Sequence, residues 1–146
     1  MTIAPEVSVR RERRAAVPVV VAAAMAPLLV WLVADPLLGA RLEVFTPRGA
    51  VELGAPPILI AGVLSALAGW GLRGLLDRFA PRRGRTIWVV TAVLALVLSF
   101  LPLTDPAIST STRLWLGLMH VVVGAVLIAG LGRRRDDRQP VAGRRD

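Results

Sequence analysis

The 146-residue chain is more apolar than an ordinary soluble domain: 55% of its residues are hydrophobic, where about 45–50% is usual, and its mean hydropathy is +0.63. With no cysteine and one histidine, the sequence excludes disulfides, thiolate chemistry and a ligand cluster for a metal ion. The net charge of +8 comes from arginines clustered between apolar runs, which is typical of membrane-flanking charge and argues against a nucleic-acid-binding face.

A basic segment, residues 1–14, opens the chain, and an apolar run from about 15 to 38 follows it. A secretory signal peptide begins in the same way, but its apolar region is only about 7–15 residues long and ends at a small-x-small cleavage site. This run is longer, and Leu32-Val33-Ala34 has leucine where a small residue is required. We therefore expect a retained first transmembrane helix, kinked at Pro27, after a basic cytoplasmic tail.

Further apolar runs follow at about 53–76, 86–103 and 113–131. Each is close to the ~20 residues that cross a bilayer as a helix, and none alternates in the manner of a barrel strand. The sequence therefore predicts an all-α fold, an integral membrane four-helix bundle that forms one domain over 15–132. The basic segment 133–146 is expected to be a disordered cytoplasmic tail.

The arginines predict the orientation of the bundle. Fifteen lie in the two tails and between the second and third runs, and three lie in the other two connections. The positive-inside rule then places both termini in the cytoplasm, in a plasma membrane whose anionic lipid headgroups meet the arginines. Tryptophans near the ends of the runs are expected to act as interfacial anchors, namely Trp31, Trp70, Trp88 and Trp115.

The connection between the first two runs has room for structure of its own. Residues 41–45 alternate between polar and apolar, Thr46-Pro47-Arg48-Gly49 is typical of a turn, and residues 50–52 could return as a second short strand. The sequence is compatible with an outer hairpin and with a linker that has no regular structure.

His120, the only histidine, lies inside the fourth run, and Ser99 lies at a similar depth in the third. In antiparallel helices these intramembrane polar side chains could face each other and bind a ligand or a proton. The alternative is a structural role, in which His120 fixes helix register through a serine hydroxyl or a backbone carbonyl. Because no carboxylate is placed to orient a Ser–His pair, we predict no enzyme activity, no cofactor and no metal site.

Small residues recur along the second run and on the His120 face of the fourth, at spacings of three and four that favour close helix packing. They are Ala61, Gly62, Ser65, Ala66, Gly69, Gly117 and Gly124. The sequence leaves open whether these contacts form within one chain or between chains.

Several short motifs resemble an uncharacterised family of small four-span membrane proteins from high-GC actinobacteria. They are Gly69-Trp70, Leu75-Leu76-Asp77-Arg78, Arg85-Thr86-Ile87-Trp88, Leu98-Ser99-Phe100-Leu101-Pro102-Leu103 and Leu118-Met119-His120. The resemblance covers roughly Leu42 to Gly130, implies four spans and adds no reaction, since that family has no assigned activity.

The leading hypothesis for function is an accessory or scaffold subunit, either a homo-oligomer or the partner of another membrane protein. The second is a small transporter or lipid-ligand binder that uses His120 and Ser99. Drug–proton exchange is disfavoured because the first helix has no acidic residue between Ala15 and Ala34. A third hypothesis, an enzyme acting on a lipid or quinone, lacks a carboxylate pair and an oriented nucleophile.

Overall fold

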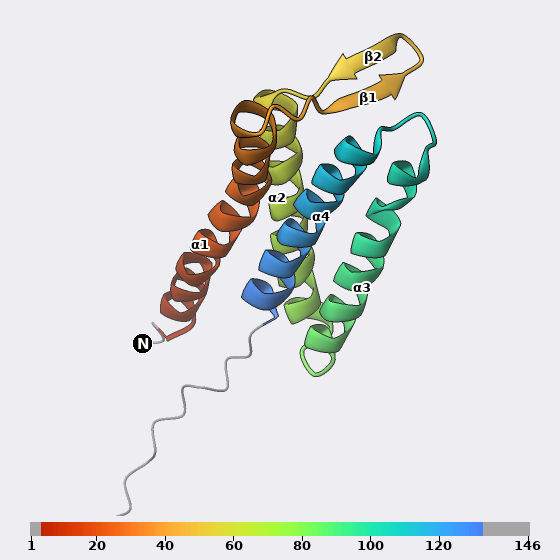
Figure 1. Cartoon of the computed structure of the whole chain (residues 1–146). Helices are drawn as coiled ribbons and strands as arrows, with labels where there is room; N and C mark the ends of the chain where they lie inside the picture. Colours follow the sequence, from red (N-terminus) through yellow and green to blue (C-terminus); the bar gives the residue numbers. More distant parts are fainter. Residues whose placement is uncertain (1–3, 133–146) are drawn as a thin grey trace, which may run out of the picture.

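The computed structural model describes residues 4–132, so the expected tail at 133–146 lies outside the described residues. Successive helices run antiparallel, and a two-stranded hairpin projects from one end of them (Figure 1). The long helices are α1 (Ala4–Leu32), α2 (Ala55–Phe79), α3 (Gly84–Ser99) and α4 (Thr110–Leu131). The short elements are a π-helical turn, η1 (Val33–Leu37), the strands β1 (Glu43–Thr46) and β2 (Gly49–Glu52), and a 3-10 helix, η2 (Leu101–Thr104).

Four helical segments in the described residues are long and apolar enough to cross a membrane, as the sequence predicts. Their bounds are Ala16–Leu37, Ala55–Phe79, Gly84–Thr104 and Thr110–Leu131. Helix α1 begins well before the first of these segments, at Ala4, within the part that the sequence indicated only as a basic tail. Arginine, glutamate and alanine dominate residues 10–16, and because all three favour helix, α1 extends beyond its apolar run.

The third span is built from two helices because of a proline. Helix α3 ends at Ser99, and η2 continues the span with Pro102 in its first turn. Proline has no backbone N–H and disfavours the α conformation of the residue before it, so the α-helical hydrogen-bond pattern stops there. The predicted third run, 86–103, therefore contains an α-helix followed by a tighter 3-10 turn.

The hairpin pairs β1 with β2 in antiparallel register, from Glu43 opposite Glu52 to Thr46 opposite Gly49. Gly49 completes the reversal with φ +119°, a conformation that L side chains rarely adopt. The base of the hairpin is fixed to the bundle, because Leu42 is completely buried and the carbonyl of Arg41 accepts a 3.4 Å hydrogen bond from Thr112 Oγ1 on α4.

Buried side chains form two separate clusters along the bundle. One lies toward the α2–α3 connection and joins all four helices through Ala24, Ala66, Trp88 and Leu127. The other lies below the hairpin and contains Ala34, Leu42, Ile58 and Met119. Helix α4 lies between α1 and α3 in Figure 1 and packs against each of the other three helices.

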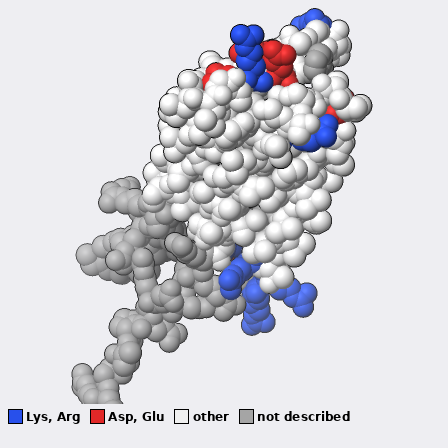
Figure 2. All heavy atoms as spheres, viewed as in Figure 1, with Lys and Arg blue, Asp and Glu red and all other residues white. Residues whose placement is uncertain are grey.

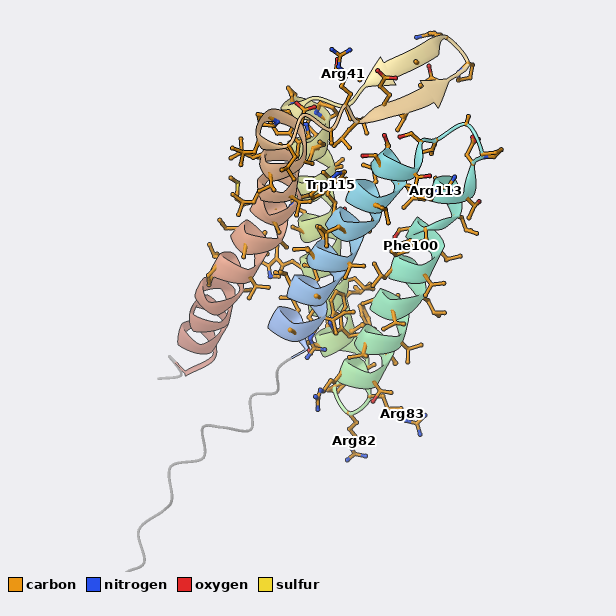
Figure 3. All side chains as sticks on the ribbon, in the orientation of Figure 1. Arg41, Arg82, Arg83, Phe100, Arg113 and Trp115 are labelled. Atoms are coloured by element: carbon orange, nitrogen blue, oxygen red, sulfur yellow. The ribbon has the colours of Figure 1, made fainter. Side chains whose placement is uncertain are left out.

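Charged side chains gather at the two ends of the bundle and leave an uncharged band between them on the face shown in Figure 2. Arg82 and Arg83 extend from the α2–α3 connection, whereas Arg41 and Arg113 lie at the hairpin end (Figure 3). Long apolar side chains of the helices, such as Leu64 and Leu94, are more than half exposed. This exposed apolar surface suits hydrocarbon as the surrounding solvent.

Candidate functional site

A cavity of about 470 Å³ lies between α2, α3 and α4. Most of its lining is aliphatic, and polar side chains enter it at Ser65, Thr91, Ser99 and His120. A largely apolar wall with a few polar groups, in this range of volume, is typical of small-molecule sites in proteins. This cavity is the candidate functional site, and we call it the groove.

The groove is elongated and open on one side. Along α2 its lining extends from Pro57 to Leu72, which corresponds to about 22 Å of helix. Ala61, Ser65 and Ala68 of α2 line it and are exposed, as is Ala95 of α3. The opening therefore lies between α2 and α3 and faces sideways, toward the position that lipid would occupy.

Small side chains are the reason that a groove forms here. Ala61, Ser65 and Ala68 of α2 face Ala92 and Ala95 of α3 across the cavity. These side chains are too short to fill the space between the two backbones. At the end nearer the α2–α3 connection a larger side chain closes the gap, because the ring of Trp88 approaches Gly69, where a β-carbon would lie 3.3 Å from its Cη2 atom.

Some of the predicted helix-packing residues make close contacts between helices, some line the groove, and some do both. Gly62 lies directly against α1, where a β-carbon would come within 2.6 Å of the Ala24 carbonyl oxygen, and Ala66 is completely buried. Gly117 packs on Phe100, and Gly124 packs on Leu96. Ala61, Ser65 and Gly69 line the groove, and so do Gly62 and Gly124.

His120 and Ser99 both line the groove, but no hydrogen bond joins them in the described part of the chain. Ser99 Oγ donates to the Leu96 carbonyl at 2.6 Å, and His120 Nδ1 lies 2.6 Å from the Leu116 carbonyl. Each side chain thus bonds to the backbone of its own helix, so His120 does not fix the register of α3 and α4. The nearest aromatic neighbour of His120 is Phe100, with ring centroids 6.1 Å apart.

The contact with Leu116 fixes which ring nitrogen of His120 carries the proton. A carbonyl oxygen can only accept a hydrogen bond, so Nδ1 is the donor, and in the neutral ring Nε2 is the acceptor. Among the described residues, none donates to Nε2, and the half-buried ring lines the groove. The groove therefore contains a free hydrogen-bond acceptor about halfway along α4.

Trp88 departs from its expected role as an interfacial anchor. Its side chain is only 2% exposed and closes the groove at the end nearer the α2–α3 connection, because the small residues opposite leave room for a ring. Trp31 lies near the hairpin and donates from Nε1 to the Leu53 carbonyl at 2.9 Å. Trp70 and Trp115 are half-buried, a position compatible with an anchor at either end.

The α2–α3 end of the bundle is held by an arginine that sequence reasoning counted only among the orienting charges. Arg73 Nε donates to the Leu131 carbonyl at the end of α4, at 3.1 Å, and Arg73 Nη2 lies 3.0 Å from Asp77 Oδ1. A signal for this role was present in the sequence, since Arg73 lies within an apolar helix, a turn before the cluster of arginines begins.

Within the described residues no group of three or more histidine, cysteine or acidic side chains could hold a metal ion.

Sequence reasoning also missed the α3 wall of the groove. Thr91, Ala92 and Ala95 are small residues in a helix otherwise rich in leucine and valine, and this local change in side-chain size was the available signal.

A protein-family model described as a family of unknown function (DUF6069) matches residues 7–137. No curated protein and no solved structure matches the chain.

Proposed function

The chain belongs to this family of unknown function, and from that premise we propose that it is a multi-pass membrane protein that binds an apolar, membrane-dissolved ligand in the groove. The match agrees with the expected membership of an uncharacterised family. An actinobacterial source remains part of the proposal, supported by the GC-rich codon preference that a chain with arginine and no lysine implies.

One observation carries the proposal: a cavity of about 470 Å³ lies between three helices and is open toward the lipid position. Both polar residues singled out from the sequence, Ser99 and His120, contribute to its wall. A ligand dissolved in the bilayer could enter sideways without crossing a polar surface. The wall of the groove has no acidic residue, so the proposed activity is binding, with no chemical reaction.

The topology of the proposal follows from the charges. Arg82 and Arg83 mark the α2–α3 end (Figure 3), and the hairpin end carries Glu43 and Glu52 beside its arginines. The positive-inside rule then supports cytoplasmic termini, an outer hairpin and a plasma-membrane location. Anionic lipid headgroups would meet the arginines of the inner end.

Filling the groove tests the proposal. Ala95→Trp places a large ring in the wall of the groove, and Val93→Trp places the same ring on an α3 position that is 43% exposed and outside the wall. Each protein, in mild detergent, is incubated with 1-methoxyhexadecane, and bound molecules are counted by native mass spectrometry. We expect Ala95→Trp to lower occupancy at least tenfold and Val93→Trp to leave it unchanged. Equal binding by both variants would contradict a ligand role for the groove.

A second candidate, an accessory subunit that associates through α2, is favoured by Gly71 and Gly74. A β-carbon at either position would meet nothing within 4 Å, so a helix of another chain could approach closely there. The same mass spectra decide this candidate, because it requires dimers or a co-purifying partner. A strictly monomeric protein without a partner would exclude it.

A further inference from the structure

Resting on the proposed function, we propose that the groove is specific for an uncharged lipid that carries a hydroxyl group, which donates a hydrogen bond to His120 Nε2. Nδ1 is engaged by the Leu116 carbonyl at 2.6 Å, so in the neutral ring Nε2 can only accept. The complementary group on a ligand is therefore a hydrogen-bond donor. An ether, an ester or a hydrocarbon of the same size cannot supply one.

The charge of the groove selects an uncharged ligand. His120 is the only ionisable residue among the described residues of its wall, which has no arginine, lysine, aspartate or glutamate. A phosphate or ammonium headgroup would find no counter-charge there, and burial of an unpaired charge is costly. A hydroxyl group costs much less to desolvate and is compensated by one hydrogen bond.

The depth of His120 in the bundle also favours an uncharged ligand over a phospholipid. Ten residues separate it from Thr110, the first residue of α4, which places it about 15 Å along the helix. The headgroup of a phospholipid stays at the bilayer surface and would not reach this level. A single hydroxyl on an apolar body can lie at this depth.

The shape of the groove accommodates a long apolar body. Phe100 contacts the ring of His120, so the end of α3 lies level with it. The α3 wall extends from Ser99 to Trp88, about 16 Å of helix. Ser99 Oγ donates its own hydrogen to the Leu96 carbonyl but can still accept one, so the binding experiment has to separate it from His120 Nε2. The lipid tail would lie along this wall and end against Trp88.

The inference is tested with two probes that differ only in the hydrogen-bond donor. Hexadecan-1-ol carries the hydroxyl group, and 1-methoxyhexadecane has the same chain without a donor. Affinities for both are measured by native mass spectrometry on the full chain in mild detergent. The wild-type protein should prefer the alcohol about five- to tenfold, the ratio that one neutral hydrogen bond provides. His120→Phe keeps an aromatic ring but no acceptor, and it should bind both probes equally. Ser111→Ala, an exposed α4 position outside the wall, is the control and should keep the preference. Ser99→Ala should also keep it, and loss of the preference in that variant would assign the acceptor to Ser99 and overturn the inference.

The outcomes separate this inference from the proposed function. Equal binding of both probes by the wild-type protein, or a preference that survives in His120→Phe, overturns the hydroxyl specificity and leaves ligand binding intact. Failure of the wild-type protein to bind either probe overturns both. If His120→Phe binds neither probe, His120→Gln is measured in its place, because the glutamine side-chain carbonyl is a hydrogen-bond acceptor. A retained preference of His120→Gln for the alcohol supports the inference. Equal binding of the two probes by this variant overturns it.

Discussion

Two glycines of α2 illustrate how much a single position depends on its surroundings. At Gly62 a β-carbon would lie 2.6 Å from the Ala24 carbonyl oxygen and 2.9 Å from Pro27 Cγ, whereas at Gly71 it would meet nothing within 4 Å. The sequence shows both as small residues on an apolar helix and predicts close packing for the first of them. It cannot say which face of α2 meets α1, because that depends on how four helices share their surfaces.

Gly62→Ala should therefore destabilise the bundle. The added methyl group meets backbone and a proline ring, neither of which can move aside easily, and overpacking of this kind costs about 1–3 kcal/mol. The measurement is thermal unfolding in detergent, followed by circular dichroism. Gly71→Ala is the control and should be neutral or stabilising by up to about 1 kcal/mol, because alanine favours helix. Equal losses of stability in the two variants would contradict this account of the α1–α2 contact.

Among the elements, Arg73 fastens the C-terminal end of α2 to the C-terminal end of α4. Its Nε donates to the Leu131 carbonyl, one of the acceptors that a helix terminus leaves without an intrahelical partner. Sequence reasoning predicted the four helical segments because length and hydropathy suffice for that. It did not predict this fastening or the groove, because both depend on how the helices are rotated about their axes.

Arg73→Met should weaken the link between α2 and α4. The variant removes a charge-assisted hydrogen bond to a helix end, which is worth about 1.5–3 kcal/mol. Asp77→Asn removes only the partner of an ion pair whose carboxylate side chain is 43% exposed, and exposed pairs contribute about 0–1 kcal/mol. Thermal unfolding of both variants should therefore show the larger loss for Arg73→Met. A larger loss for Asp77→Asn would mean that the ion pair, and not the bond to Leu131, holds the inner end.

The whole molecule has an uneven charge distribution, with an uncharged band between two charged ends (Figure 2). The number of transmembrane spans was predictable from the number and length of the apolar runs in the sequence. The orientation was predicted from arginine counts, a statistical rule that no contact within the bundle tests. The hairpin could be read from the sequence only as one of two alternatives, because short strands depend on tertiary anchors such as the buried Leu42.

Because the chain has no cysteine, single-cysteine variants test the orientation directly. Arg48→Cys places a thiol in the hairpin turn, and Arg82→Cys places one in the α2–α3 connection. A membrane-impermeant maleimide should label the first in intact cells and the second only after permeabilisation. Labelling in the opposite order would reverse the proposed topology.

The position of α4 also bears on how the protein is made. Synthesis proceeds from the N-terminus, so α1, α2 and α3 are made before the helix that packs against all three of them. Until α4 is made, the wall residues Met119, Val123 and Leu127 are missing from the groove. The groove can therefore be completed only by the last helix of the bundle.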